Sequence, residues 1–426
     1  MEILKYPERK DWGALLQRPA LDVTALFDTV RGVIDAVKKD GDAAVKRYEK
    51  KFDQVELTCL KVSSEEMAEC DDLLSDELKT AIRQAKKNIE LFHASQRFAG
   101  LEVETYPGVV CRQKALPIEK VGLYIPGGTA PLFSTVLMLA VPAQIAGCSE
   151  IVLCTPPNAA GKVHPAILFA AKEAGVSQVI KAGGIQAIAA MAYGTETVSK
   201  VYKIFGPGNQ YVTAAKQLVS LRDVAIDMPA GPSEVEVIAD AFANPEFIAS
   251  DFLSQAEHGK DSQAILLTTS EQLLEQVQGA ISRQLDRLPR KEITSLALLH
   301  SRIILFHNMD EVMDFTNAYA PEHLIIQTEN YTELAARVRN AGSVFMGPYT
   351  PESAGDYASG TNHTLPTNGY AKAYNGVNLD SFTKKITFQE ITAEGIKGLG
   401  ETIRVMAENE SLEAHRNAVT VRLKSL

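Results

Sequence analysis

The sequence has few of the features that mark secreted, membrane-bound or nucleic-acid-binding proteins. Its five cysteines, an odd number, never have Cys-x-x-Cys spacing, so they indicate neither a disulfide framework nor a thiolate metal knuckle. With 53 acidic and 43 basic residues, the net charge is -10, and no basic tract could follow a phosphate backbone. The most apolar stretch, 132–147, contains Ser134, Thr135, Pro142 and Gln144, and the first residues lack an apolar signal region. We expect a soluble, cytoplasmic protein with no nucleic-acid or membrane partner.

The pattern of apolar residues predicts an α/β protein with two Rossmann-like open parallel-sheet modules. The first hundred residues are mainly helical in periodicity, with a capping box at Ser63 and Glu66, and a helical tail runs from about Thr392 to Leu423. Between them, short β-rich runs alternate with helix-length segments, as in parallel βαβ units. The expected strands are 121–125, 150–154, 177–182 and 200–205 in one module, and 234–239, 263–268, 302–306, 323–327 and 343–346 in the other.

We divide the chain into four parts on this basis. Residues 1–120 are an N-terminal helical region with the start of the first lobe, and 121–233 form that lobe. Residues 234–380 form the second lobe, and 381–426 form a helical tail. The short linker IDMPAGPSE (226–234) predicts a ligand cleft between the lobes, and the long polar loop 347–376 is also typical of a functional segment.

Two glycine-containing turns follow predicted strands of the first lobe. They are IPGG (125–128) and GPGN (206–209), and no GxGxxG fingerprint accompanies them. At strand ends, such turns let a phosphate or nicotinamide approach the backbone, but spacing alone favours plain strand-to-helix turns.

A metal site is one interpretation of the segment NPEFIASDFLSQAEHG (244–259). The segment predicts a helix with Asn244 as its cap, and it places Gln255 and His258 three residues apart on one face of the last turn. Asp356, His363 and His415 are candidates to complete an N/O ligand set. The alternative is that His258 only complements the helix C-terminus.

Glu322 and His323 are candidate acid/base residues at the start of a strand. Adjacent strand residues point to opposite faces, so both serve one site only if the backbone turns there, which Pro321 favours. Their alternative is a structural ion pair. Cys148 and Cys154 are candidate nucleophiles for aldehyde oxidation, but their apolar settings favour buried structural thiols.

Long segments spread over the chain carry a resemblance to a known family. They are VGLYIPGGTAPLFSTVLMLAVPAQIAGC, KIFGPGN, IDMPAGPSE, LSQAEHGKDSQ, PEHLIIQT, AGSVFMG, ESAGDYASGTNHTLPT and AHRNAV. In this order they closely resemble the histidinol dehydrogenase family, most weakly before about residue 100. The resemblance implies a zinc-containing, NAD-dependent oxidoreductase that converts L-histidinol to L-histidine through L-histidinaldehyde, with one zinc per site and two NAD per turnover.

The same resemblance implies roles for individual residues. Glu322 and His323 match the family's acid/base pair, and the zinc ligands match Gln255, His258, Asp356 and His415. The four zinc-ligand side chains and His323 are also expected to contact the substrate. Further substrate contacts match Ser233 and Glu410, with His363 as an additional candidate, and NAD contacts match Tyr124, Gln186 and Asn209.

Because Glu410 and His415 lie in the tail, the resemblance also implies a homodimer in which one subunit's tail completes the other's site. Two other classes of protein remain alternatives. One is a non-catalytic protein whose lobes close on a small polar ligand, and the other is a zinc hydrolase with Glu322 as its base.

Overall fold

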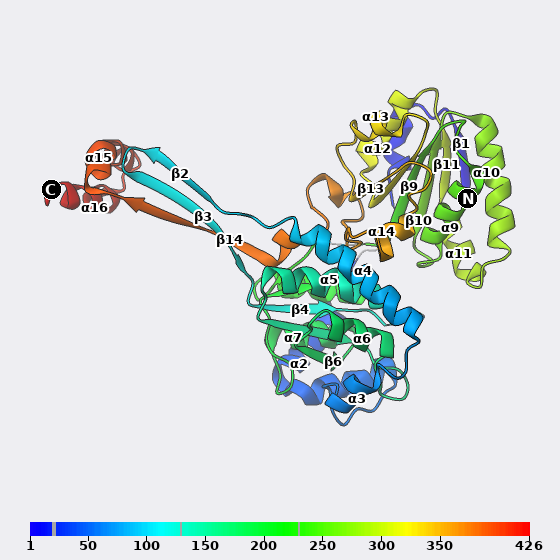
Figure 1. The fold of residues 1–426 in the computed structure, drawn as a ribbon, viewed down its shortest axis with the longest axis horizontal. Coiled ribbons are helices and arrows are strands. Elements are labelled where there is room, and N and C mark those ends of the chain that lie inside the picture. The colour runs from blue at the N-terminus through cyan, green and yellow to red at the C-terminus, as the bar shows by residue number, and fades with distance from the viewer. Residues whose placement is uncertain (19–22, 128–129, 229–230) are drawn as a thin grey trace.

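Two α/β lobes and a long arm make up the chain (Figure 1). The computed structural model describes residues 1–18, 23–127, 130–228 and 231–426. Both lobes contain an open parallel sheet, and helices occupy the N-terminal region and the C-terminal end, so the fold class predicted from the sequence is confirmed. None of the described helices is long and apolar enough to span a lipid bilayer.

The first lobe is built on a five-stranded parallel sheet of order β6-β5-β4-β7-β8. Strand β4 therefore lies between β5 and β7, where the strand order reverses, and open α/β sheets bind ligands at the carboxyl ends of strands at such a point. The strands are β4 (Lys120–Tyr124), β5 (Glu150–Thr155), β6 (Gln178–Lys181), β7 (Lys203–Phe205) and β8 (Ala225–Ile226).

Helices cover both faces of this sheet and bury it in two apolar clusters. Helix α4 (Asp76–Ala94), α5 (Phe133–Ala146) and α6 (Pro165–Glu173) cover one face. The other face packs against α2 (Phe27–Tyr48), α7 (Gly184–Tyr193) and α8 (Gln210–Ser220). The turn η3 (Glu49–Asp53) continues α2, and the predicted capping box opens α3 (Ser64–Glu69).

The second lobe contains a six-stranded parallel sheet of order β1-β11-β10-β9-β12-β13. Its first edge strand comes from the N-terminus of the chain, which the sequence did not indicate. The strands are β1 (Glu2–Lys5), β9 (Glu234–Ala239), β10 (Gln263–Thr268), β11 (Arg302–Leu305), β12 (His323–Gln327) and β13 (Ser343–Met346). The helices are α1 (Trp12–Leu15), α9 (Pro245–Ala256), α10 (Glu271–Leu285), α11 (Lys291–Leu298), α12 (Met309–Tyr319), α13 (Tyr331–Ala335) and α14 (Glu352–Tyr357). Short 3-10 turns are η1 (Arg9–Asp11), η2 (Val23–Leu26), η4 (Tyr370–Lys372) and η5 (Leu379–Phe382).

The arm projects away from both lobes and ends in two helices (Figure 1). Its stem is an antiparallel sheet of β2 (Leu101–Tyr106), β3 (Val109–Pro117) and β14 (Thr383–Ile391), and its tip is α15 (Ala393–Asn409) with α16 (Glu413–Leu423). The sequence predicted the helices but not the three strands. The side chains of β2 and nearly all of those of β14 are exposed in this chain, and most of those of β3 are only partly buried, so the three strands lack the buried apolar runs by which the other strands were recognised.

Candidate functional site

A cavity of about 780 Å³ opens at the carboxyl ends of the first lobe's strands. Tyr124, Gln186 and Asn209, the three residues expected to contact NAD, all line it. The hydroxyl of Tyr124 accepts a hydrogen bond from the Gly184 N–H at 3.1 Å. Asn209 caps α8 by accepting hydrogen bonds from the backbone of Tyr211 and Val212. The cavity has the size of a small-molecule site and lies at the topological switch point.

Both glycine-containing turns lie at this end of the sheet. Pro126 and Gly127 of IPGG line the cavity, whereas Gly128 lies outside the described residues. Gly206 of GPGN has a φ of 122°, and a Cβ there would lie 2.0 Å from the Tyr124 carbonyl oxygen. Only glycine allows this close approach of the two backbones. The GPGN turn is therefore more specialised than the plain strand-to-helix turn that its spacing alone favoured.

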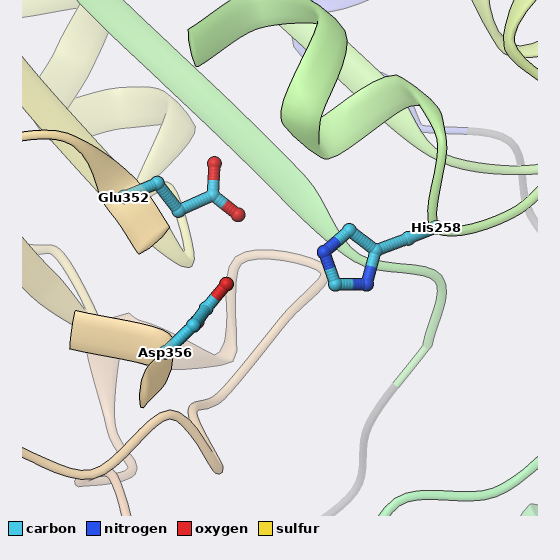
Figure 2. A group of neighbouring side chains, drawn as sticks. All are labelled: His258, Glu352 and Asp356. Atoms are coloured by element: carbon cyan, nitrogen blue, oxygen red, sulfur yellow. The ribbon is translucent and has the colours of Figure 1, made fainter. Parts of the chain in front are cut away.

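A cluster of possible metal ligands lies in the second lobe (Figure 2). One ligand atom from each of His258, Glu352 and Asp356 lies within 4.8 Å of the others, and Figure 2 shows the three side chains converging from α14 and the loop after α9. Gln255, on the last turn of α9, is fully buried, and its two side-chain polar atoms have no hydrogen-bond partner in the described chain. Buried polar atoms of this kind are ordinarily satisfied by a water molecule, an ion or another ligand.

The local geometry of Gln255 and His258 differs from the expected helix face. Helix α9 begins as predicted, with Asn244 accepting a hydrogen bond from Glu246 N–H at 2.9 Å. It ends at Ala256, so the prediction that His258 lies on the last turn of the helix is wrong. The His258 N–H donates to the backbone carbonyl oxygen of Gln255 at 3.2 Å, three residues back, which tightens the chain after the helix. His258 is therefore exposed on a turn beyond the helix end.

The acid/base candidates lie beside this cluster, and the backbone does turn between them. Strand β12 begins at His323, and Glu322 occupies a bend immediately before it. Both side chains therefore approach one another, with Glu322 Oε2 at 3.6 Å from His323 Nδ1. Glu322 Oε2 also accepts a hydrogen bond from the Glu234 N–H at 2.9 Å, which fixes the carboxylate against β9.

His323 is buried among three carboxyl groups. Besides Glu322, Glu352 lies 3.8 Å from its Nδ1, and Asp356 lies 3.8 Å from its Nε2. Burial alone lowers the pKa of this imidazole, but the charges of Glu322 and Glu352 outweigh it and raise the pKa to about 10. For the Glu352 carboxyl, burial disfavours the charged form and therefore raises the pKa. The pocket thus gathers three acidic side chains around one imidazole, and such surroundings favour a cation.

His363 connects the two lobes at this site. Its Nδ1 lies 2.9 Å from the backbone oxygen of Asp356, and its Nε2 lies 3.0 Å from the hydroxyl oxygen of Thr135 on α5. Burial lowers the pKa of His363, so the neutral ring donates from Nδ1 and accepts at Nε2. The start of α5 is thereby held against the loop that carries Asp356.

The remaining predicted substrate contacts lie in three places. Ser233 immediately precedes β9 and is partly exposed. Glu410 and His415 lie at the tip of the arm, at the end of α15 and on α16, and both are exposed. Figure 1 shows this tip far from α14, so one chain alone does not bring Glu410 or His415 to the metal cluster.

The two candidate nucleophilic cysteines are unreactive in their settings. Burial raises the pKa of Cys148 to about 12 and that of the fully buried Cys154 still further. Neither would be a thiolate at neutral pH, which agrees with structural thiols.

Sequence reasoning missed Glu352. It lies four residues before Asp356 on α14, so the two carboxyls share one helix face. That i,i+4 spacing within ESAGD was visible in the sequence and could have indicated a second ligand. Glu352 is 1% exposed, and both of its carboxyl oxygens are without a hydrogen-bond partner in the part of the chain that is described.

Comparisons with known proteins agree over nearly the full length. The family model described as histidinol dehydrogenase matches residues 16–423. The chain is 68% identical over 426 residues to a histidinol dehydrogenase of Bacteroides thetaiotaomicron, with 100% of each chain covered. It is 54% identical to that of Escherichia coli (strain K12), covering 97% of this chain and 95% of the relative. A crystal structure of the histidinol dehydrogenase from Elizabethkingia anophelis superposes with a TM-score of 0.98 at 56% identity, covering 100% of this chain and 98% of that one.

Proposed function

The chain belongs to the histidinol dehydrogenase family, an oxidoreductase family of histidine biosynthesis, and we propose that its two lobes cooperate in NAD-dependent oxidation of L-histidinol to L-histidine. The observation that carries the proposal is the convergence on His323 of Glu322 and the cluster containing His258 and Asp356. The cavity of the first lobe is the proposed NAD site.

The second lobe's cluster fits a divalent metal ion. Imidazole and carboxylate donors within 4.8 Å of one another suit zinc, and buried Gln255 offers an unpaired amide oxygen. We propose that Gln255, His258 and Asp356 hold zinc in this chain. A bound zinc would supply positive charge that opposes the raised pKa of His323, and it would position the nitrogens of the amino alcohol.

His323 is the proposed proton acceptor in both oxidations. In the first step, it takes the hydroxyl proton while hydride leaves the same carbon for NAD, giving the aldehyde. Glu322 then accepts a proton from water, whose hydroxide adds to the aldehyde carbon while protonated His323 returns its proton to the carbonyl oxygen, which gives the hydrate and leaves His323 neutral again. His323 takes a hydroxyl proton of the hydrate as its hydride passes to a second NAD, which leaves the carboxylic acid.

The arm supports a homodimer as part of this function. Its strands and helices expose large apolar side chains to solvent in the single chain, and such a surface is typical of a subunit contact. We propose that the arm of one subunit delivers Glu410 and His415 to the site of its partner. The exposed arm residues include Leu101, Val103, Ile386, Phe388, Met406 and Leu412.

The test is to mix purified, zinc-loaded protein with L-histidinol and NAD and follow NADH absorbance. We expect two NADH per L-histidinol, with L-histidine as the product. A flat trace with intact, metal-loaded protein would leave a binding protein. Turnover of an ester or amide without any nicotinamide would instead favour the zinc hydrolase.

A further inference from the structure

The proposed cofactor cavity contains almost no charge to bind phosphate. Its described lining includes Asp53 as the sole carboxyl group, and neither lysine nor arginine is part of that lining. A 2′-phosphate on the adenosine ribose, which distinguishes NADP from NAD, is ordinarily accommodated by an arginine. The charge of this cavity is therefore the opposite of what an NADP site requires.

Asp53 occupies the place where a dinucleotide fold usually has its acidic residue. In such folds, a carboxylate at the end of the second strand accepts a hydrogen bond from the ribose 2′-hydroxyl. Here the second strand is β5, which ends at Thr155 and is followed by Pro156 and Pro157, and none of these three residues carries a carboxylate. Asp53 reaches the same place from η3.

The glycine at the end of β6 shows how close Asp53 lies to the end of β5. A Cβ built on Gly183 would lie 2.8 Å from Pro156 Cβ and 3.5 Å from Asp53 Oδ2. Pro156 and Asp53 thus both adjoin Gly183, and both line the cavity. Asp53 thus provides, from outside the βαβ unit, the carboxylate that the end of β5 lacks.

Glu49 fixes this arrangement from one turn earlier in η3. Its Oε1 accepts hydrogen bonds from the Gly183 N–H at 2.8 Å and from Gln186 Nε2 at 2.7 Å. Gln186 lines the cavity, is fully buried, and has an Oε1 with no hydrogen-bond partner in the described chain. An unpaired buried amide oxygen at the cavity wall points to a polar ligand. Glu49 is therefore a positioning residue that holds both η3 and the Gly183 turn.

Glu49 and Asp53 together place negative charge where the cofactor would bind. Burial raises the pKa of Glu49 to about 7, and burial raises the pKa of Asp53 as well. Asp53 is the more exposed of the two and faces the cavity, so it carries the charge at neutral pH. A phosphate dianion beside it would be repelled by this charge.

We propose, resting on the NAD-dependent function above, that Asp53 selects NAD over NADP by accepting a hydrogen bond from the ribose 2′-hydroxyl and repelling a 2′-phosphate. Glu49 supports this selection by fixing η3 against the Gly183 turn. The preference for one dinucleotide thus depends on a residue that lies outside the sheet and its crossovers.

The test compares kcat/KM for NAD and NADP in Asp53→Asn, Asp53→Ala and the unaltered enzyme, with L-histidinol saturating. Asp53→Asn removes the charge but keeps an acceptor oxygen, so we expect the NAD preference to fall about tenfold or more, mainly through a lower KM for NADP. Asp53→Ala also removes the acceptor, so the KM for NAD should rise about tenfold as well. We expect kcat with NAD to stay near its original value in both.

Glu56→Gln is the matched control. Glu56 is three residues away, its side chain is 79% exposed, and it does not line the cavity, so this variant removes one negative charge from the same segment. Its dinucleotide preference should equal that of the unaltered enzyme. If Asp53→Asn keeps the original preference, or if Glu56→Gln loses as much, the proposal is wrong.

Direct binding separates this proposal from the function on which it rests. Titrating NADH and NADPH and following nicotinamide fluorescence needs no turnover. Failure of L-histidinol to reduce NAD would overturn the proposed function, yet the NADH-to-NADPH affinity ratio would still report on Asp53. A ratio that Asp53→Asn leaves unchanged would overturn the role of Asp53 even in an active enzyme.

Discussion

His323 is the residue on which the proposed chemistry depends most directly. Its imidazole is buried, and Glu322, Glu352 and Asp356 all lie within 3.8 Å of a ring nitrogen. The backbone oxygen of Glu234, 3.3 Å from His323 Nδ1, positions the ring, and the charges of the neighbouring carboxyls influence how readily it takes a proton. Removing the imidazole would therefore remove the proposed proton transfer and leave the proposed metal ligands in place.

We predict that His323→Asn lowers kcat by about two to four orders of magnitude, in the range lost with a general acid/base, while L-histidinol still binds. The measurement is NADH formation over a range of L-histidinol concentrations, with metal content determined in parallel. His300→Asn, at an exposed position of the same lobe, is the control and should be fully active. Undiminished turnover in His323→Asn would remove this histidine from the mechanism.

A different outcome is expected for Glu322→Gln, because the proposed role of Glu322 belongs to the second oxidation. In the unaltered protein, the Glu234 N–H donates a hydrogen bond to Glu322 Oε2 at 2.9 Å. A glutamine side chain keeps an oxygen that can accept this bond, so the local fold should persist. We predict that oxidation of L-histidinaldehyde slows far more than oxidation of L-histidinol. Separate assays with each substrate measure this difference, and equal slowing of both would contradict the assigned role.

At the scale of single elements, strand β9 is fully buried and contains two glutamates. Glu234 and Glu236 lie two residues apart and therefore on the same face of the strand, and both are almost fully buried. Arg18 pairs with Glu234, with its Nε at 2.7 Å from Glu234 Oε2. Neither oxygen of Glu236 has a hydrogen-bond partner within the described residues, and burial raises its pKa to about 8.

The sign of the resulting pH dependence follows from proton binding. Between the ordinary carboxyl value of 4.5 and about 8, Glu236 keeps its proton in the folded chain but loses it in the unfolded chain. The folded state then binds more protons, so this group makes the free energy of unfolding fall as pH rises through that window, by at most about 1.4 kcal/mol per pH unit. Above about 8 its contribution changes no further.

We predict that Glu236→Gln makes the free energy of unfolding less dependent on pH across this window. Urea unfolding at a series of pH values measures it. Glu275→Gln, at an exposed carboxyl on α10 of the same lobe, should retain the pH dependence of the unaltered protein. Identical slopes for Glu236→Gln and the unaltered protein would show that Glu236 is not held protonated.

Elements that bury their own apolar residues could be predicted from the sequence, whereas elements that bury none in this chain could not. β4, β5, β9 and β10 have continuous β-rich runs, and all were predicted nearly to the residue. β14 pairs with β3 along its whole length but exposes most of its side chains, so its stability comes from backbone hydrogen bonds that composition does not show.

The candidate site shows a similar division. Asn244 and Pro245 marked the start of α9, because a cap and a first-turn proline are local signals. Its end at Ala256 depends on how the chain turns toward His258, which no local pattern fixed. Asp53 belongs to a helical segment distant in sequence from the strands, so only the folded chain shows it at the end of β5.

At the scale of the whole molecule, the chain separates its functional parts in space. The proposed cofactor cavity lies in the first lobe, the candidate metal ligands and His323 lie in the second, and His363 bridges the lobes through Thr135. The arm holds Glu410 and His415 far from both (Figure 1). A single chain with this shape has an incomplete set of the expected ligands, so a closed two-fold dimer is the simplest assembly that completes it.

Mixing two inactive variants tests that assembly. We predict that His258→Asn and His415→Asn are each inactive as homodimers, but that coexpressing them restores activity. In the mixed dimer, one site receives both substitutions, while the other combines an intact His258 with the partner's intact tail. Random pairing makes half of the dimers mixed, each with one of two sites intact, so about a quarter of full activity should return.

The control is the coexpression of His258→Asn with Asp356→Asn. Both substitutions lie in the second lobe, so every site of that mixed dimer lacks one ligand and no activity should return. If each tail served its own lobe, the first pair would also stay inactive, and the intertwined dimer would be ruled out.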